Sequence, residues 1–356
     1  MLFPPLPRNL EASLRDLGSE RPETRVSALA DVVRHARVDA AARERAAAEI
    51  PKLLDDERPD VRAAAATALA DVGATSALPR LLVAVEDKDA LVRQMVLSAL
   101  GELGDARAAP RLSRALSDER PEVRYQAIIA YARTEPDAGD VAKALARAFA
   151  DEDPAIAHIA LRVAEERLDA SPPRPEGEDA RGQEGYRGSG AHAGKLEAAA
   201  ERLLDADHPD VALAAAIFLA KSGHEGARAK VLAVVAGQGP PVNKEDEAAA
   251  VELAGELGLR EALPHLERRA RGLARFVRDT CALSARIALA RLGDERACRS
   301  ILDDLGSRNG ATRSAAIIAA GRARLEAARP ELERVTGDVE VLAREALALL
   351  DRSARP

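Results

Sequence analysis

Three stretches of the sequence are copies of one element: Arg-Pro-Asp-Val-Arg at residues 58–62, Asp-Ala-Leu-Val-Arg at 89–93 and Arg-Pro-Glu-Val-Arg at 120–124. Successive copies are 31 residues apart, and the residues around them repeat in the same register. A fixed period of roughly 20 to 50 residues is typical of proteins that stack one small unit along their length. The three copies therefore predict a repeat protein.

Each copy opens a pair of short helices. Val61, Ala65 and Leu69 are spaced by four residues, which places them on one face of a helix that Gly73 ends. A second apolar stretch over 78–85 predicts the next helix. Helices this short must stack on neighbouring pairs to bury their apolar faces.

The unit resembles a known repeat. Its pattern is Asp, five residues, Arg, an Ala-rich helix and then Leu-Gly-Asp, as in Asp87, Arg93 and Leu103-Gly104-Asp105. This pattern is similar to the HEAT repeat, and in particular to bacterial HEAT-like repeats of the phycobilin-lyase type. Weaker copies cover nearly the whole chain. The resemblance implies an all-α fold, a right-handed α-solenoid of about ten two-helix HEAT-type repeats, and it says little about function.

In the family, the Asp and Arg of each unit form a ladder along the stack. The positions that match this ladder are Asp56, Arg62, Asp87, Arg93, Asp118 and Arg124. A carboxylate just before a helix accepts hydrogen bonds from its free amides, and the Arg can bond to neighbouring turns, so we expect a structural role. Later in the chain Ala157, Ala212 and Ala343 stand at the Arg position, and there we expect stacking to rest more on packing.

A Gly- and Pro-rich stretch interrupts the array. Residues 171–194 hold nine Gly or Pro in 24 positions, which predicts a flexible insertion between an N-terminal block, 1–170, and a C-terminal block, 195–356. Insertions in repeat proteins often lie on a binding face, so Tyr186 is a candidate contact residue. The alternative is a surface loop without a binding role.

Composition and charge limit where the protein works. The net charge of −7 argues against a protein that neutralises phosphates over its whole surface. No stretch approaches the roughly 20 apolar residues of a membrane span, and residues 1–7 lack the basic start of a signal peptide. Cys281 and Cys298 form no disulfide framework or zinc spacing. We expect a cytoplasmic protein of bacterial type.

The sequence gives little support to catalysis. Iron-dependent HEAT-repeat hydroxylases need several His-Glu pairs, and this chain has one, at 224–225. A bilin lyase would need aromatic walls, and the chain has three Tyr, four Phe and no Trp. We therefore expect no catalytic residue, cofactor or metal, with a HEAT-like lyase as the less favoured alternative.

A solenoid offers a long concave face that suits a peptide, a helix or a partner domain. We therefore expect a non-catalytic scaffold or adaptor that binds another protein, whose identity the sequence does not reveal. Side chains off the apolar stripe are the candidates to line this face: Arg62, Thr67, Gln94, Ser98, Gln126 and Ile129. Ile129 and Tyr131 form an unusually apolar spot that serves either a partner or internal packing.

A basic segment supports the alternative function. Its five arginines lie within eleven residues: Arg268, Arg269, Arg271, Arg275 and Arg278. Such a corner could bind nucleic acid or another polyanion, as in HEAT-like DNA glycosylases, although those enzymes combine a longer basic channel with aromatic residues. The competing interpretation is a solvated face in which Glu267 and Asp279 balance the charge.

Overall fold

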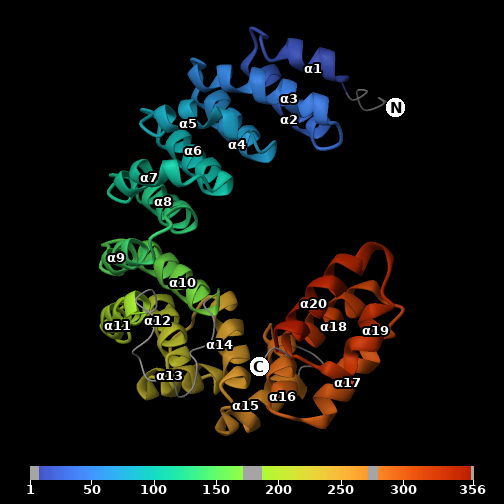
Figure 1. Cartoon of the computed structure of the whole chain (residues 1–356). Coiled ribbons are helices and arrows are strands. Elements are labelled where there is room, and N and C mark those ends of the chain that lie inside the picture. Colours follow the sequence, from blue (N-terminus) through green and yellow to red (C-terminus); the bar gives the residue numbers. More distant parts are fainter. Residues whose placement is uncertain (1–7, 171–186, 272–279, 354–356) are drawn as a thin grey trace. The chain divides into compact units, whose positions relative to one another are not determined.

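The structure, a computed structural model, describes residues 8–170, 187–271 and 280–353 (Figure 1). These residues form helices and turns, with no strand among them. The chain folds as two compact units, Met1–Ala199 and Ala200–Pro356, called unit 1 and unit 2 below. Within the described ranges no helix is both long and apolar enough to cross a membrane.

Unit 1 begins with a short helix and continues in helix pairs. Its α-helices are α1 (Leu10–Asp16), α2 (Pro22–Ala36), α3 (Ala40–Glu49), α4 (Pro59–Asp71), α5 (Leu78–Ala84), α6 (Ala90–Leu103), α7 (Ala109–Ala115), α8 (Pro121–Thr134), α9 (Ala138–Ala148), α10 (Pro154–Ala170) and α11 (Arg187–Glu201), the last of which crosses into unit 2. Short 3-10 helices are η1 (Ile50–Asp55), η2 (Thr75–Ala77) and η3 (Ala106–Ala108).

Unit 2 continues the same alternation. Its α-helices are α12 (Pro209–Lys221), α13 (Glu225–Val235), α14 (Lys244–Glu256), α15 (Leu263–Arg271), α16 (Ala282–Arg291), α17 (Glu295–Leu305), α18 (Gly310–Arg322), α19 (Arg329–Glu333) and α20 (Glu340–Ser353). Its 3-10 helices are η4 (Arg260–Ala262), η5 (Glu326–Ala328) and η6 (Gly337–Val339). The prediction of an all-α stack of helix pairs is confirmed.

Local sequence explains where the helices begin and end. The Asp89 carboxylate accepts hydrogen bonds from the amides of Leu91 and Val92 at the start of α6, and Pro59 and Pro121 occupy the first turns of α4 and α8. Gly104 ends α6 with φ of 63°, a left-handed conformation that favours glycine. Similar caps begin α9, α13 and α17, where the side chains of Asp137, His224 and Asp294 accept from helix amides.

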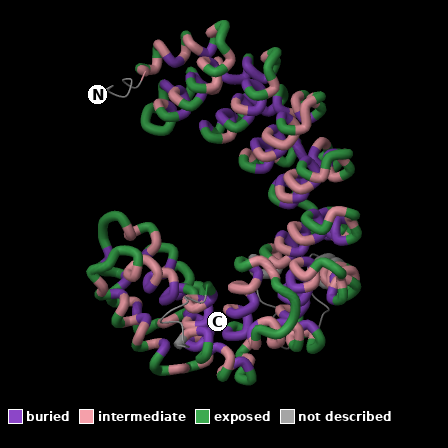
Figure 2. Tube along the Cα trace, turned by 180° about the vertical axis from the view of Figure 1, so that it is seen from behind, coloured by how far each residue is buried: buried purple, intermediate pink, exposed green. Residues whose placement is uncertain are grey.

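The helices of unit 1 form two layers. Helices α4, α6, α8 and α10 pack side by side in one layer, and α5, α7 and α9 form the other (Figure 1). Buried apolar side chains such as Leu69, Leu100 and Ile128 fill the space between them. Figure 2 shows buried residues in pair after pair and exposed residues at the turns. Each pair therefore completes the core of its neighbours.

The described residues bear on the predicted insertion only in part. Helix α11 begins at Arg187, inside the 171–194 stretch, so the first turns of this helix are built from residues that we expected to form a loop. Residues 171–186, and with them Tyr186, lie outside the described residues. The block boundaries at 170 and 195 stay a prediction.

Three glycines let neighbouring helices approach closely. They are Gly101 on α6, Gly255 on α14 and Gly321 on α18, and each lies three positions before a residue with positive φ. A Cβ at Gly101 would lie 2.8 Å from the Cα of Ala130, and one at Gly255 would lie 2.5 Å from the Cα of Ala288. No side chain fits at these distances, so the two backbones are in contact.

Replacing Gly255 with Ala should therefore destabilise unit 2. Alanine favours the helix by about 1 kcal/mol, but its methyl group must push α14 and α16 apart, which costs about 3 kcal/mol. We expect a net loss of about 2 kcal/mol in urea unfolding followed by circular dichroism. Gly310→Ala is the matched control, because nothing lies within 4 Å of its Cβ position on α18. Equal stabilities for the two variants would contradict the contact.

Candidate interaction surface

Partly exposed side chains recur in the same register on the first layer of unit 1. Their common feature is a position on the side of α4, α6, α8 and α10 that does not face the core. From the middle turns of these helices we select Ala64 and Thr67 on α4, Gln94, Met95 and Ser98 on α6, Tyr125, Gln126 and Ile129 on α8, and His158, Ile159 and Arg162 on α10. We call this set the α4–α10 face.

The α4–α10 face carries little formal charge, although the exposed residues that follow it by one helical turn, Asp71, Glu102 and Arg133, are charged. Met95 and Gln126 are 31 residues apart, as are Ser98 and Ile129, so the repeat brings equivalent side chains onto adjacent helices. Arg162 is the one formally charged member of the set, and its guanidinium lies 2.7 Å from the Glu165 carboxylate. Tyr and Met side chains are enriched at protein interfaces, and charged residues are depleted at their centres.

The structure separates the two residues of the predicted apolar spot. Ile129 is half-buried and belongs to the α4–α10 face, whereas Tyr131 is only 6% exposed and packs inside the helix pair. Burial raises the pKa of the Tyr131 hydroxyl, and the nearby carboxylates of Glu135 and Asp140 raise it further. The geometry of Tyr131 fits packing within its pair.

The predicted ladder residues meet across successive repeats. Arg62 donates from Nε and Nη2 to the Asp87 carboxylate of the next repeat at 2.7 and 2.8 Å. Its Nη1 donates to the backbone carbonyls of Asp56 and Glu57 at 2.8 and 3.1 Å. Each arginine therefore joins the start of its own helix to the next repeat, and Arg62 is not available on the α4–α10 face.

The same geometry recurs along unit 1. Arg93 binds Asp118 at 2.8 and 2.9 Å, and Arg124 binds a carboxylate that we did not predict, that of Asp151, at 2.9 and 2.7 Å. At the other end Arg25, also not predicted as a ladder residue, binds Asp56 at 2.8 Å. We call these four arginine–carboxylate contacts, of which three are bidentate and that of Arg25 is single, the arginine ladder.

A short signal could have found the two missed residues. Asp151 lies 33 residues after Asp118, so a strict 31-residue register misses it. However, the sequence Asp-Glu-x-Pro occurs at 56–59, 118–121 and 151–154, and Glu-Arg-Pro at 20–22 precedes Arg25. This local motif finds Asp151, which the period misses, whereas the period finds Asp87, which is followed by Lys-Asp-Ala.

Three of the ladder carboxylates, those of Asp87, Asp118 and Asp151, have lowered pKa values. Burial by itself would raise the pKa of Asp118, but hydrogen bonds from the Arg93 guanidinium and the Arg120 amide outweigh it, so the pKa lies below its ordinary value. Asp87 and Asp151 behave in the same way, with Arg62 and Arg124 as their guanidinium partners. These three carboxylates are therefore ionised at neutral pH.

The described part of the basic segment is mostly engaged with the protein itself. Arg269 is 8% exposed, donates to the carbonyls of Val235 and Val234 at 2.9 and 3.0 Å, and pairs with Glu247 at 2.8 Å. Arg268 is exposed and donates to the carbonyl of Ala236 at 2.7 Å. The side chains of Arg271, Arg275 and Arg278 lie outside the described residues.

A search for metal ligands gives no candidate. Among the described residues, no group of three or more His, Cys, Asp or Glu side chains is placed to hold an ion. His224 instead starts α13, where its Nδ1 accepts from the amide of Ala227 at 3.2 Å. Its role in the described geometry is that of a helix cap.

Asp118→Asn tests the ladder and its pH dependence. Leaving Arg93 buried beside a neutral amide should destabilise unit 1 by about 3 kcal/mol at pH 7, measured by urea unfolding. Because the folded pKa of Asp118 is below the unfolded value of about 3.9, its contribution is present above that value and lost as the pH falls through the folded pKa. The difference between wild type and variant should therefore shrink below about pH 4.

The control for this substitution is Glu119→Gln. Glu119 lies 4.0 Å from the same arginine but is exposed, so its removal should change little at any pH. A stability gap for Asp118→Asn that is the same at pH 3 as at pH 7 would contradict the assigned pKa direction.

Comparison with known proteins identifies one segment. Residues 46–132 match the family model for HEAT repeats. No curated protein sequence matches the chain. Solved structures of similar fold include an engineered protein that is 18% identical, with a TM-score of 0.41 and coverage of 97% of this chain and 99% of that one.

A second solved structure is the complex of CpcE and CpcF of phycocyanin lyase from Nostoc sp. PCC7120. It is 15% identical, has a TM-score of 0.40, and the match covers 98% of this chain and 96% of that one. A further engineered protein is 21% identical over 61% of this chain and 98% of that one, with a TM-score of 0.42. The sequence match is the informative finding: residues 46–132, which carry the ladder from Asp56 to Arg124, are HEAT repeats.

Proposed function

We propose that the protein is a non-catalytic scaffold or adaptor that binds another protein along the α4–α10 face. In this proposal it acts in the bacterial cytoplasm. The observation that carries it is the row of weakly charged, half-exposed side chains repeated in register on α6, α8 and α10. Such a row gives an extended peptide or a helix equivalent contacts at each repeat.

The opposite layer of unit 1 has a different character. Its outward side chains mix apolar residues such as Val83 with charged residues that form ion pairs with neighbouring turns: Arg80 pairs with Asp55, and Arg111 with Glu86. Exposed pairs of this kind are well solvated and add little binding energy. The contrast between the two layers supports the α4–α10 face as the interaction surface.

The alternative, a polyanion-binding corner from Arg268 to Arg278, has less support. Arg269 is buried against carbonyl oxygens and Glu247, so of the described side chains only Arg268 is exposed there. A polyanion site at this corner would depend on Arg268 and on residues outside the described range. No geometric observation favours it over the scaffold.

The test is the capture and titration of a partner. A partner recovered from lysate of the source organism, with nuclease present and at both low and high salt, is purified and titrated against wild type and Met95→Glu/Ile129→Glu. Two charges on the half-buried face should weaken binding at least about tenfold, or about 1.4 kcal/mol. Circular dichroism checks that the variant folds.

Val83→Glu is the matched control. Val83 is 73% exposed on α5, in the opposite layer, so a charge there should leave the affinity unchanged. The proposal fails if the α4–α10 face variant binds the partner as wild type does. It also fails if nuclease removes everything that is recovered, which would favour the polyanion alternative.

A further inference from the structure

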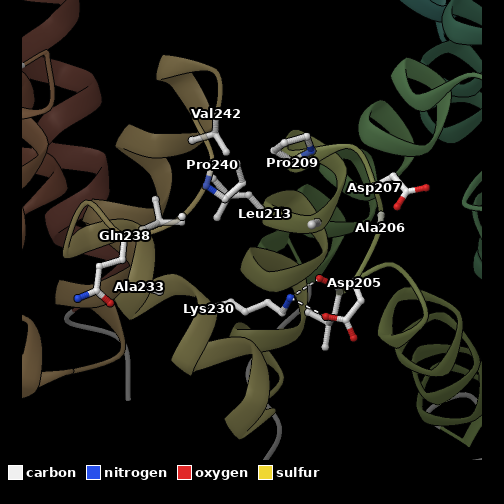
Figure 3. A pocket seen from close by; sticks show the side chains of 14 residues that line it. Asp205, Ala206, Asp207, Pro209, Leu213, Lys230, Ala233, Gln238, Pro240 and Val242 are labelled. Carbon is white, nitrogen blue, oxygen red and sulfur yellow. Dashed lines mark hydrogen bonds and ion pairs between the residues drawn. The ribbon is translucent and has the colours of Figure 1, made fainter.

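A cavity of about 370 Å³ lies in unit 2 beside the start of α12 (Figure 3). Its walls come from the loop before α12, from α13, and from the loop before α14. Ala206 and Ala212 are both part of the lining, and apolar walls are supplied by Leu213, Val234 and Val242. Of these residues, Ala206 and Ala212 stand at positions where unit 1 has charged residues.

Ala212 stands at the position of the ladder arginine. It lies four residues after His208, the N-cap of α12, just as Arg62 lies four residues after Arg58, the N-cap of α4. Ala206 correspondingly stands where Asp56 does, six residues before the arginine position. Both charged members of the ladder are therefore replaced by Ala in this repeat.

Unit 1 contains the corresponding cavity with the arginine in place. A cavity of about 280 Å³ beside α8 is lined by Arg124, Asp118 and Leu116, which correspond to Ala212, Ala206 and Leu204 in the cavity of unit 2. The larger cavity in unit 2 is thus the ladder position without its arginine side chain. Ala212 is accordingly half-exposed, whereas Arg62 is buried.

Because Ala212 replaces the arginine, two backbone carbonyls lack the hydrogen-bond donor that they have in unit 1. In four repeats of unit 1 the arginine Nη1 donates to the two carbonyls that lie six and five residues earlier: Ser19 and Glu20, Asp56 and Glu57, Asp87 and Lys88, and Asp118 and Glu119. The equivalent carbonyls of Ala206 and Asp207 accept no hydrogen bond from any residue that the structure describes. They are acceptors held in the geometry that receives a guanidinium elsewhere in the chain.

The rim of the cavity is acidic. Asp207 is exposed, and the Asp205 side chain is 92% exposed. Lys230 does not reverse this charge, because its Nζ is bonded to the Leu204 carbonyl at 2.5 Å and to Asp205 at 2.9 Å, as the dashed lines in Figure 3 show. Asp205 balances the charge of Lys230, so Asp207 gives the lining residues a net negative charge.

We propose that this cavity receives an arginine side chain of a partner protein, which takes the place of the missing ladder arginine. The aliphatic part of that side chain packs on Leu213, Val234 and Val242, and the guanidinium donates to the carbonyls of Ala206 and Asp207. In unit 1 one nitrogen, Nη1, meets both carbonyls, so a lysine ammonium is the nearest competitor for the site. The guanidinium suits the site better because it brings further N–H donors to the acidic rim. This inference rests on the proposed function, because it takes the occupant to belong to a bound protein.

The experiment uses the full chain and a defined probe, N-acetyl-L-argininamide, followed by ligand-observed NMR. We expect saturable binding with a dissociation constant on the order of millimolar, as befits a single side chain. N-acetyl-L-citrullinamide has nearly the same shape but no charge. Its dissociation constant should be at least about tenfold higher, because the charge-assisted hydrogen bonds are lost. N-acetyl-L-lysinamide should fall between the two.

Ala212→Arg supplies the missing side chain from the chain itself. It should abolish probe binding while leaving the thermal unfolding midpoint unchanged or higher. Ala64→Arg is the matched control, because it adds the same charge on α4 at a residue that does not line the cavity, and should bind the probe as wild type does. Asp207→Asn should keep the fold and weaken binding severalfold, so it decides the matter if Ala212→Arg does not fold.

Two results would overturn the proposal: equal binding of the arginine and citrulline probes, or undiminished arginine binding by folded Ala212→Arg and by Asp207→Asn. The titration involves no partner protein. Its failure would therefore leave the scaffold function standing, and a failure of partner capture would leave the titration interpretable.

Discussion

The contact between a ladder arginine and the carboxylate of the next repeat is the constraint on which unit 1 depends. A buried guanidinium is tolerated only when its donors are satisfied, and Arg62 and Arg93 meet this condition by spanning two repeats. Apolar packing alone would let one helix pair slide on the next. The bidentate geometry fixes one register, and the α4–α10 face inherits its regular rows from it.

Unit 2 holds its repeats together by other means. Backbone contact at Gly255 joins α14 to α16, and side-chain bonds add to it: Arg291 pairs with Glu256 at 2.9 Å, and the Ser284 hydroxyl donates to Glu252 at 2.8 Å. Arg269 ties α15 to the end of α13. These contacts do not need a charged pair at the start of each helix. Alanine can therefore replace the ladder residues at positions 206 and 212. Departures from a repeated pattern of this kind are where function is most readily accommodated.

The sequence was sufficient for the helix pairs, the period and the identity of most ladder residues, because each is a local pattern of capping residues and apolar spacing. It was not sufficient for the partner of each arginine, since the carboxylate comes from the following repeat. The burial of individual side chains could not be predicted either. The sequence leaves Tyr131 open between partner binding and internal packing and makes Arg269 a candidate contact residue, and tertiary neighbours bury both. A cavity that arises from two alanines is visible only when the repeats are superimposed in space.

The identical bonding of Arg62 and Arg93 has a consequence for how this chain can change length. Removing residues 62–92, which span 31 positions, would bring Arg93 directly after Val61. Arg93 would then find the carbonyls of Asp56 and Glu57 behind it and Asp118 ahead of it, with every spacing preserved. The contacts between successive repeats of unit 1 are thus equivalent. Duplication or loss of a whole 31-residue period would change the length of unit 1 without requiring a new kind of contact.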